Sequence, residues 1–364
     1  MFEVISKKAN SRIGKLTTNH GELKTPFFMP DATRGFVRSL DNRDLEEAGI
    51  GPMVVNAYHL YLKPGMEIIK KAGGIHNFLN WQKPLLSDSG GYQVFSLIHK
   101  NPKMGKITEN EVIFQSPSDG SRHIFTPEKI IQVQFDLGTD MIVCLDDPPP
   151  NSYSKDKIKK AVERTIRWAK RCKDEYDKQV ESRKIRVENR PLIFGVIQGG
   201  EHLELREYCA KELVKIGFGG YGFGARHIGF EGNIMDEVLE KTASFIPKDS
   251  LRFALGIGTP EDIVKCVNFG WDMFDCVIPT REGRHGRLFI KKENSKSYKT
   301  VNISNEKFKN DFSRVDKNCN CELCQNYSRA YLNHLFAMKE PLGMRLASIH
   351  NLRFYSDFMS SLIN

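Results

Sequence analysis

Two aspartates stand where acid–base chemistry on a bound substrate could take place. Asp88 and Asp275 each follow a short apolar run, in PLLSDSGGYQ and DMFDCVIPTR. Two carboxylates that face one anomeric carbon can work as nucleophile and as general acid/base in glycosyl transfer. Two carboxylates at strand ends can also hold a magnesium ion, so the residue types alone leave both chemistries open.

Further polar residues end other apolar runs and are suited to a flat heterocycle. Asp146 in CLDDPPP can accept hydrogen bonds from the two adjacent donors on the edge of a guanine, or it can cap the following helix. Gln198 in VIQGG can add an amide to the same base. Tyr92 can stack on a ring or pack in the core.

Three of the eight cysteines are crowded together as Cys-x-Cys-x-x-Cys at Cys319, Cys321 and Cys324. Three thiolates and one imidazole make a closed tetrahedral zinc site, which is structural because no position stays open for chemistry. The fourth ligand is expected to be His334 or His350, and spacing leaves both open. The other five cysteines are scattered, which suits a reducing compartment.

The elements that must position these residues are eight short apolar runs separated by helix-like segments. The runs lie at 25–33, 52–60, 84–93, 140–147, 191–200, 220–229, 252–262 and 272–281. Helices are expected at 41–49, 127–138, 202–217 and 259–270. Strand–helix alternation predicts a parallel sheet, and eight units favour a (β/α)8 barrel over a doubly wound sheet.

A barrel gathers the carboxyl ends of its strands around one pocket, where Asn56 also ends a run. We therefore expect a catalytic barrel over 1–300 and a zinc-binding subdomain with C-terminal helices over 301–364.

The net charge of +9 is unevenly distributed. Residues 155–190 hold 14 basic and 7 acidic residues, but their apolar spacing predicts an amphipathic helix with a solvated face. Residues 281–299 hold 7 basic and 2 acidic residues without such spacing, so this stretch, with Arg281, Arg284 and Arg287, is predicted to bind a polyanion. The N-terminus lacks an apolar signal region and no segment reaches the length of a membrane span, so a cytoplasmic protein without membrane contact is expected.

Long motifs follow one another along the chain: NAYHLYLKPG, SDSGGYQVFSL, GVIQGG, ALGIGTPED, MFDCVIPTREGRHGRLF, CNCELC and ASIHN. Through these motifs the sequence resembles the tRNA-guanine transglycosylases over nearly its whole length. The resemblance implies a zinc-bearing (β/α)8 barrel that exchanges guanine at the wobble position of tRNA for a 7-deazaguanine base, through a covalent glycosyl-enzyme and without a nucleotide cofactor. It also implies a homodimer.

The resemblance assigns roles to individual residues. Asp275 becomes the nucleophile and Asp88 the general acid/base, with Asn56 beside it. The base pocket comprises Tyr92, Asp146, Gln198, Gly224 and Leu255. The arginines at 281, 284 and 287 seat anticodon phosphates, and the zinc ligands are Cys319, Cys321, Cys324 and His350.

Two departures from the family lie in the pocket for the incoming base. The chain reads GARHIGF from Gly224 to Phe230, where the family reads GGLAVGE, and Asp147-Pro148 replace a glutamate and a cysteine. The base is therefore expected to be either the aminomethyl precursor or queuine. The alternatives are a paralogue that acts on DNA or hydrolyses the base, and a non-catalytic tRNA-binding partner subunit.

Overall fold

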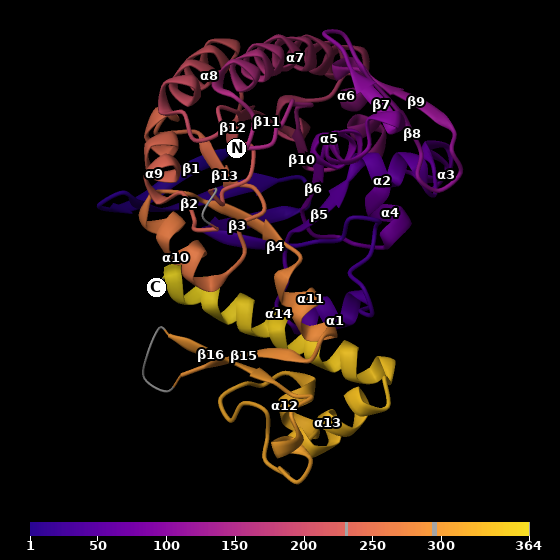
Figure 1. Cartoon of the computed structure of the whole chain (residues 1–364), viewed down its shortest axis with the longest axis vertical. Coiled ribbons are helices and arrows are strands. Elements are labelled where there is room, and N and C mark those ends of the chain that lie inside the picture. The colour runs from indigo at the N-terminus through magenta and orange to yellow at the C-terminus, as the bar shows by residue number, and fades with distance from the viewer. Residues whose placement is uncertain (230–231, 293–296, 364) are drawn as a thin grey trace.

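The computed structural model describes residues 1–229, 232–292 and 297–363. Its centre is an eight-stranded parallel sheet with the order β4-β14-β13-β12-β11-β10-β6-β5 (Figure 1). The strands are β4 (Phe27–Pro30), β5 (Met53–Asn56), β6 (Leu85–Asp88), β10 (Met141–Val143), β11 (Leu192–Ile197), β12 (Gly220–Phe223), β13 (Leu251–Ala254) and β14 (Met273–Cys276). A parallel bridge between Asp31 and Val54 brings the two ends of the sheet together, so the sheet is a nearly closed barrel. The predicted fold class and all eight predicted strands are confirmed.

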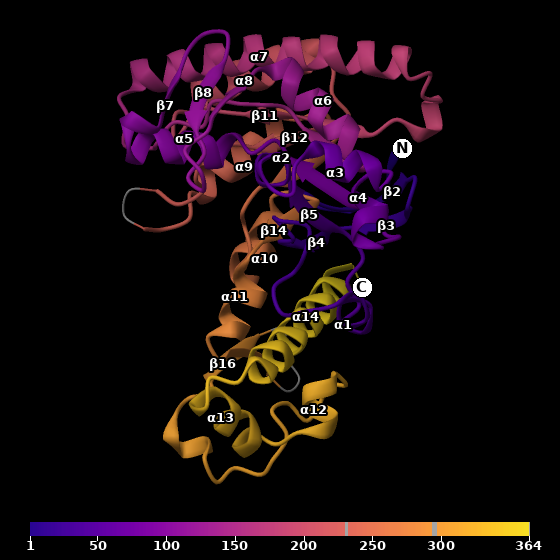
Figure 2. The same cartoon turned by 90° about the vertical axis from the view of Figure 1, so that its right-hand side faces the viewer.

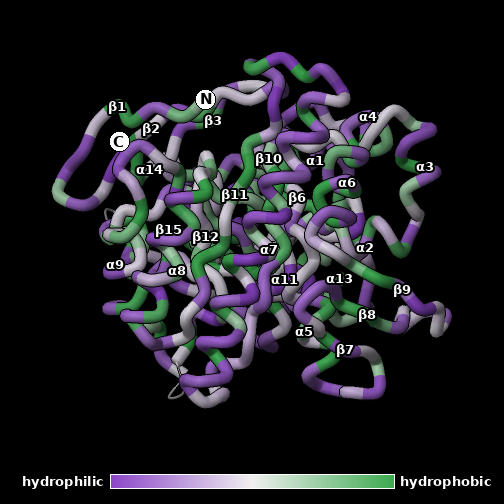
Figure 3. The backbone as a smooth tube through the Cα atoms, turned by 90° about the horizontal axis from the view of Figure 1, so that it is seen from above, coloured by the Kyte–Doolittle hydropathy of each residue, from purple (hydrophilic) through white to green (hydrophobic). Residues whose placement is uncertain are grey.

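These strands are buried on both faces, which explains why their sequences do not alternate. Phe194, Phe253 and Met273 fill the inside of the barrel, whereas Ile142, Ile193 and Phe274 pack outward against helices. Figure 3 shows hydrophobic segments along the central strands β10, β11 and β12, with hydrophilic stretches on many outlying loops.

The helices that surround the sheet begin and end at recognisable caps. Thr126 and Thr259 accept hydrogen bonds from the backbone of the first turns of α6 and α10, and Asp41 forms a capping box at α1. The predicted helices are α1 (Asn42–Glu47), α6 (Pro127–Leu137), α8 (Leu203–Ile216) and α10 (Pro260–Asn268). The remaining barrel helices are α2 (Ala57–Leu62), α3 (Met66–Lys71), α4 (Ile75–Leu79), α5 (Gly91–Lys100), α7 (Lys155–Ser182) and α9 (Asp236–Phe245). The basic stretch from 155 is the amphipathic helix α7, as expected.

Smaller antiparallel sheets decorate the barrel. The first contains β1 (Phe2–Lys8), β2 (Ser11–Thr18) and β3 (Gly21–Thr25), and the second contains β7 (Gly105–Ile107), β8 (Val112–Gln115) and β9 (Arg122–Phe125). A hairpin of β15 (Arg287–Lys291) and β16 (Tyr298–Asn302) follows the short helix α11 (Ile278–Arg284). None of these elements was predicted from the sequence.

The C-terminal region forms a separate lobe that α14 connects to the barrel (Figure 2). It contains α12 (Glu322–Asn326), α13 (Arg329–Ala337) and the start of α14 (Pro341–Ile363), and its core includes Leu288, Ile303, Leu332 and Leu346. The boundary at residue 300 stays a prediction, and the β15–β16 hairpin spans it. In the described part of the chain, no helix is both long and apolar enough to cross a bilayer.

Candidate active site

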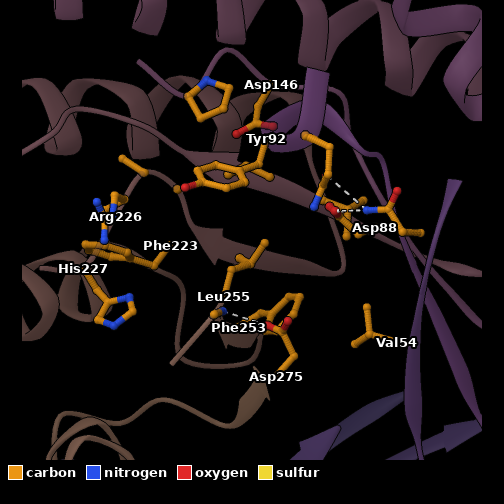
Figure 4. Close-up of a pocket in the computed structure, with 18 of the residues that line it drawn as sticks. Val54, Asp88, Tyr92, Asp146, Phe223, Arg226, His227, Phe253, Leu255 and Asp275 are labelled. Atoms are coloured by element: carbon orange, nitrogen blue, oxygen red, sulfur yellow. Dashed lines mark hydrogen bonds between the residues drawn. The ribbon is translucent and has the colours of Figure 1, made fainter. Parts of the chain in front are cut away.

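A cavity of about 320 Å³ opens at the carboxyl ends of the barrel strands. Its volume lies at the lower end of the range typical of small-molecule sites. The cavity is lined by Asp31, Thr33, Val54, Asn56, Leu86, Asp88, Tyr92, Gln93, Val143, Asp146, Pro148, Val196, Phe223, Gly224, Ala225, Arg226, His227, Ile228, Phe253, Leu255, Gly256 and Asp275. The structure thus brings most of the predicted site residues to one place (Figure 4).

Asp275 enters the cavity from the end of β14. Its Oδ1 accepts a hydrogen bond of 2.8 Å from the backbone N–H of Gly256. Burial, with smaller contributions from the charges of Asp88 and Asp31, raises the pKa of Asp275 to about 7 against the effect of that one donor. A carboxylate with few donors is a stronger nucleophile than a fully solvated one, because less hydration must be removed before it reacts.

Asp88 enters from the end of β6. Asn56 Nδ2 donates to its Oδ2 at 2.7 Å and to Gln93 Oε1 at 3.1 Å. The amide of Asn56 is itself oriented because its Oδ1 caps α2 at the N–H of His59. Burial raises the pKa of Asp88 to about 6, so about a tenth of these carboxyl groups keep their proton at pH 7.

Asp146 and Gln198 form a buried pair at the far side of the cavity. Gln198 Nε2 donates to Asp146 Oδ2 at 2.6 Å, and burial raises the pKa of Asp146 to about 7. Gln198 does not line the cavity directly; it lies behind Gly224, where a Cβ atom would come within 2.4 Å of Gln198 Nε2. Among the described residues, Gln198 Oε1 has no hydrogen-bond partner, although the side chain is fully buried.

Tyr92 and Leu255 both line the cavity. Tyr92 stands at the start of α5 and is 50% exposed, so it is not a core residue. Its ring faces the cavity in Figure 4, with Asp146 on one side and Leu255 on the other. The position is suitable for stacking on a planar base.

The three predicted RNA-binding arginines do not line the cavity. Arg281 and Arg284 lie on α11, which leads away from Asp275, and Arg287 begins β15. Arg281 and Arg287 both lie near Glu282, at 3.4 and 3.6 Å. The three arginines therefore lie outside the cavity, and their contact with phosphates stays a prediction.

The four predicted metal ligands form one buried cluster. The ligand atoms of Cys319, Cys321, Cys324 and His350 lie within 4.8 Å of one another. His350 Nε2 lies 2.8 Å from the carbonyl oxygen of Phe289, to which it must donate, so its Nδ1 lone pair faces Cys324 Sγ at 3.3 Å. His334 is not part of the cluster, which decides between the two histidines. The donors form a metal site with thiolate and imidazole ligands.

Sequence reasoning missed several residues that line the cavity. Asp31 comes directly after β4 and Asp88 is the last residue of β6, so the rule that found Asp88 would also have found Asp31. Arg226 and His227 lie in the stretch that differs from the family, and burial lowers the pKa of His227. Phe230, the last residue of that stretch, lies outside the described residues. Asp147 points away and pairs with Arg164 of α7.

Comparison with known proteins identifies the family. A family model described as "Queuine tRNA-ribosyltransferase" matches residues 7–362. The chain belongs to this family. A queuine tRNA-ribosyltransferase of Halothermothrix orenii is 42% identical over 363 residues, which cover 99% of this chain and 92% of that protein. A protein of the same name from Staphylococcus aureus is 43% identical over 356 residues, covering 98% and 89%. The predicted family and the predicted enzyme class, pentosyltransferase, are thereby confirmed.

Proposed function

We propose that this member of the queuine tRNA-ribosyltransferase family exchanges guanine at the wobble position of tRNA for a 7-deazaguanine base. The observation that carries the proposal is the convergence of Asp275, Asp88 and the Asp146–Gln198 pair on one cavity. The names of the relatives, which specify queuine and tRNA, support it.

In the first half of the reaction, the carboxylate of Asp275 attacks C1′ of the target ribose. The bond from C1′ to N9 of guanine breaks, and the carboxyl proton of Asp88 is donated to the departing base. In the second half, the incoming base attacks C1′ through N9, its proton passes to Asp88, and the ester to Asp275 breaks. No oxidant or nucleotide is consumed.

The base is held by groups with complementary donors and acceptors. Asp146 accepts hydrogen bonds from the guanine-like edge, Gln198 orients Asp146, and Tyr92 stacks on the ring together with Leu255. Gly224 leaves room for the Asp146–Gln198 pair. The incoming base is the aminomethyl precursor or queuine. Arg226 and His227 line the part of the cavity wall that distinguishes these two bases.

The tRNA contacts surfaces outside the cavity. Arg281, Arg284 and Arg287 supply positive charge on α11 and β15, near the strand that carries Asp275, where the phosphates of a flipped-out nucleotide would lie. Each phosphate contact that is lost should weaken binding and reduce its dependence on salt.

The Cys319, Cys321, Cys324 and His350 cluster binds Zn²⁺ as a structural ion. Three thiolates and one imidazole fit zinc and leave no open coordination position. When bound, the ion crosslinks the loop before α12 to α14 and supplies no catalytic chemistry.

The proposed assembly is a homodimer. The aromatic side chains of the C-terminal lobe support it: Phe312 is 80% exposed, and Tyr331, which is also exposed, stacks on Tyr327. Sedimentation equilibrium of the wild type tests this assembly, and a monomer at micromolar concentration would reject it.

The experiment for the activity is exchange of labelled guanine into tRNA that carries guanosine at the wobble position. Label should enter with the wild type and not with Asp275→Asn. Absence of label with the wild type would reject the function, and release of free base without exchange would favour a hydrolase. Label in an equivalent DNA hairpin alone would favour the paralogue that acts on DNA. Competition by each deazaguanine base then identifies the incoming one.

A further inference from the structure

A third carboxylate, that of Asp31, lies in the cavity between the two reacting acids. β4 is the neighbour of β14 in the sheet, and its bridge to Val54 makes it the neighbour of β5. Asp275 pairs with Met29, two residues before Asp31, and Val54 is two residues before Asn56. Four successive strands around the barrel therefore carry Asp275, Asp31, Asn56 and Asp88 at their carboxyl ends.

The contacts of Asp31 leave one of its oxygen atoms free for a ligand. Oδ1 accepts a hydrogen bond of 2.7 Å from the backbone N–H of Thr33 and a second one from the Thr33 hydroxyl group. In the described part of the chain, no donor binds Oδ2 and no lysine, arginine or histidine forms an ion pair with Asp31. The side chain is partly exposed and lines the cavity, so its carboxylate is not a buried structural partner.

Asp31 is also close enough to act on both reacting groups. Its charge raises the pKa of Asp88 and the pKa of Asp275, after the larger effect of burial. During the reaction, C1′ must lie against Asp275 and the base against Asp88, so the sugar occupies the space that Asp31 faces. The hydroxyl group nearest to C1′ in a ribonucleotide is the 2′-hydroxyl, which can donate to a carboxylate oxygen.

We propose that Asp31 accepts a hydrogen bond from the 2′-hydroxyl of the target nucleotide and makes the site selective for ribose over deoxyribose. The inference rests on the proposed exchange reaction and specifies the sugar on which it acts. The 2′-hydroxyl is the group by which a protein distinguishes RNA from DNA at a given position. The glycosidic bond of a deoxynucleoside is intrinsically the weaker one, so a site without this hydrogen bond would not favour the ribose substrate. A faster exchange in ribose therefore reports the hydrogen bond.

The test uses two RNA hairpins that differ only in the 2′ group of the target guanosine, either hydroxyl or hydrogen. Guanine exchange is measured as kcat/KM for each hairpin. The wild type should prefer the ribose hairpin by about tenfold or more, as expected for a hydrogen bond to a charged group. Asp31→Asn should lower this preference by about tenfold, mainly through slower exchange in the ribose hairpin.

The ratio of kcat/KM for the ribose hairpin to kcat/KM for the deoxyribose hairpin separates sugar recognition from the electrostatic effect of Asp31. Removal of its charge changes the pKa values of Asp88 and Asp275 for both substrates equally, so that effect cancels in the ratio. Asp249→Asn is the matched control, because Asp249 is exposed in the turn before β13, at the opposite end of the strand from the cavity. This variant should keep the wild-type ratio.

An unchanged ratio in Asp31→Asn, or a wild type that exchanges guanine equally well in both hairpins, would overturn the inference and leave the exchange reaction intact. No exchange in either hairpin, together with none in tRNA, would instead reject the proposed function. If Asp31→Asn does not fold by circular dichroism, Thr33→Val, which removes the hydroxyl donor that orients Asp31, should lower the ratio. A wild-type ratio in Thr33→Val would then overturn the inference.

Discussion

Replacement of Asp275 by asparagine should stabilise the folded protein while it abolishes exchange. The carboxyl group lines the cavity, and the backbone N–H of Gly256 donates a hydrogen bond to it. Asparagine keeps an oxygen for that donor and carries no charge. The folded state would therefore no longer hold a carboxylate whose ionisation burial disfavours.

The magnitude follows from the raised pKa of Asp275. In the folded state the pKa rises from 3.8 to about 7. Since one unit corresponds to about 1.4 kcal/mol, a shift of about three units sets a ceiling of about 4 kcal/mol. Water in the open cavity screens part of this, so we expect about 1–3 kcal/mol at pH 8.

The sign of the pH dependence is opposite to that of a salt-bridged aspartate. Below the unfolded pKa of 3.8 both states are protonated and the carboxyl group has no effect on stability. As the pH rises toward the folded pKa of about 7, the unfolded state is ionised first and the folded state loses stability. Above that pH the loss is constant.

Thermal melts of wild type and Asp275→Asn at pH 5 and pH 8 measure this difference. The variant should melt about 2–5 °C higher at pH 8, with less than half of that gain at pH 5. Asp249→Asn removes the same charge from an exposed turn and should show no pH-dependent gain. A variant that melts lower than the wild type at pH 8, or a gain that is equal at both pH values, would refute the reasoning.

Three further predictions concern the proton, the base pocket and the metal. The pH profile of kcat/KM for exchange should be bell-shaped with its maximum between about pH 6 and 7, because the Asp88–Asp275 pair must carry one proton. A flat profile from pH 5 to 9 would contradict this. Gly224→Ala should raise the KM for guanine about tenfold, since the new Cβ would lie 2.4 Å from Gln198 Nε2, whereas Gly51→Ala, with its nearest contact at 3.6 Å, should not. Cys324→Ser should lose bound zinc by elemental analysis and melt at a lower temperature, and His334→Ala should keep the ion, so a zinc-loaded Cys324→Ser would argue against the site.

The barrel could be predicted because its sequence signals are local. Each strand is a short apolar run that ends in a polar residue or a glycine, and Thr126 and Thr259 mark helix starts directly. Parallel strands place their carboxyl ends together, so Asp88, Asp146 and Asp275 could be assigned to one pocket from three separate runs. The small antiparallel sheets gave no comparable signal, since β1 is largely exposed.

Other features depend on the direction of the chain after a strand, which residue types do not reveal. Arg281 follows Asp275 by six residues, yet α11, which begins at Ile278, carries it about 4.5 Å along the helix axis and out of the cavity. Conversely, Ala225 adopts a left-handed backbone conformation with φ of 68°, and Arg226 and His227 after it line the cavity. The fourth metal ligand could not be chosen from residue spacing, because it depends on the packing of α14 against β15. This packing brings His350 to the carbonyl group of Phe289.

The two ends of the barrel treat the same residue type in opposite ways. At the amino-terminal end, Asp140 accepts hydrogen bonds from the backbone of Leu85 and His20, and both His20 and His76 lie against its carboxylate. These partners outweigh burial and lower the pKa of Asp140, so its charge favours folding above pH 4. At the carboxyl-terminal end, Asp88, Asp146 and Asp275 have fewer donors, and burial raises the pKa of each. A substrate that supplies the missing donors and an electrophilic carbon would relieve this penalty on binding, which is why the destabilised end of the barrel is the end that can do chemistry.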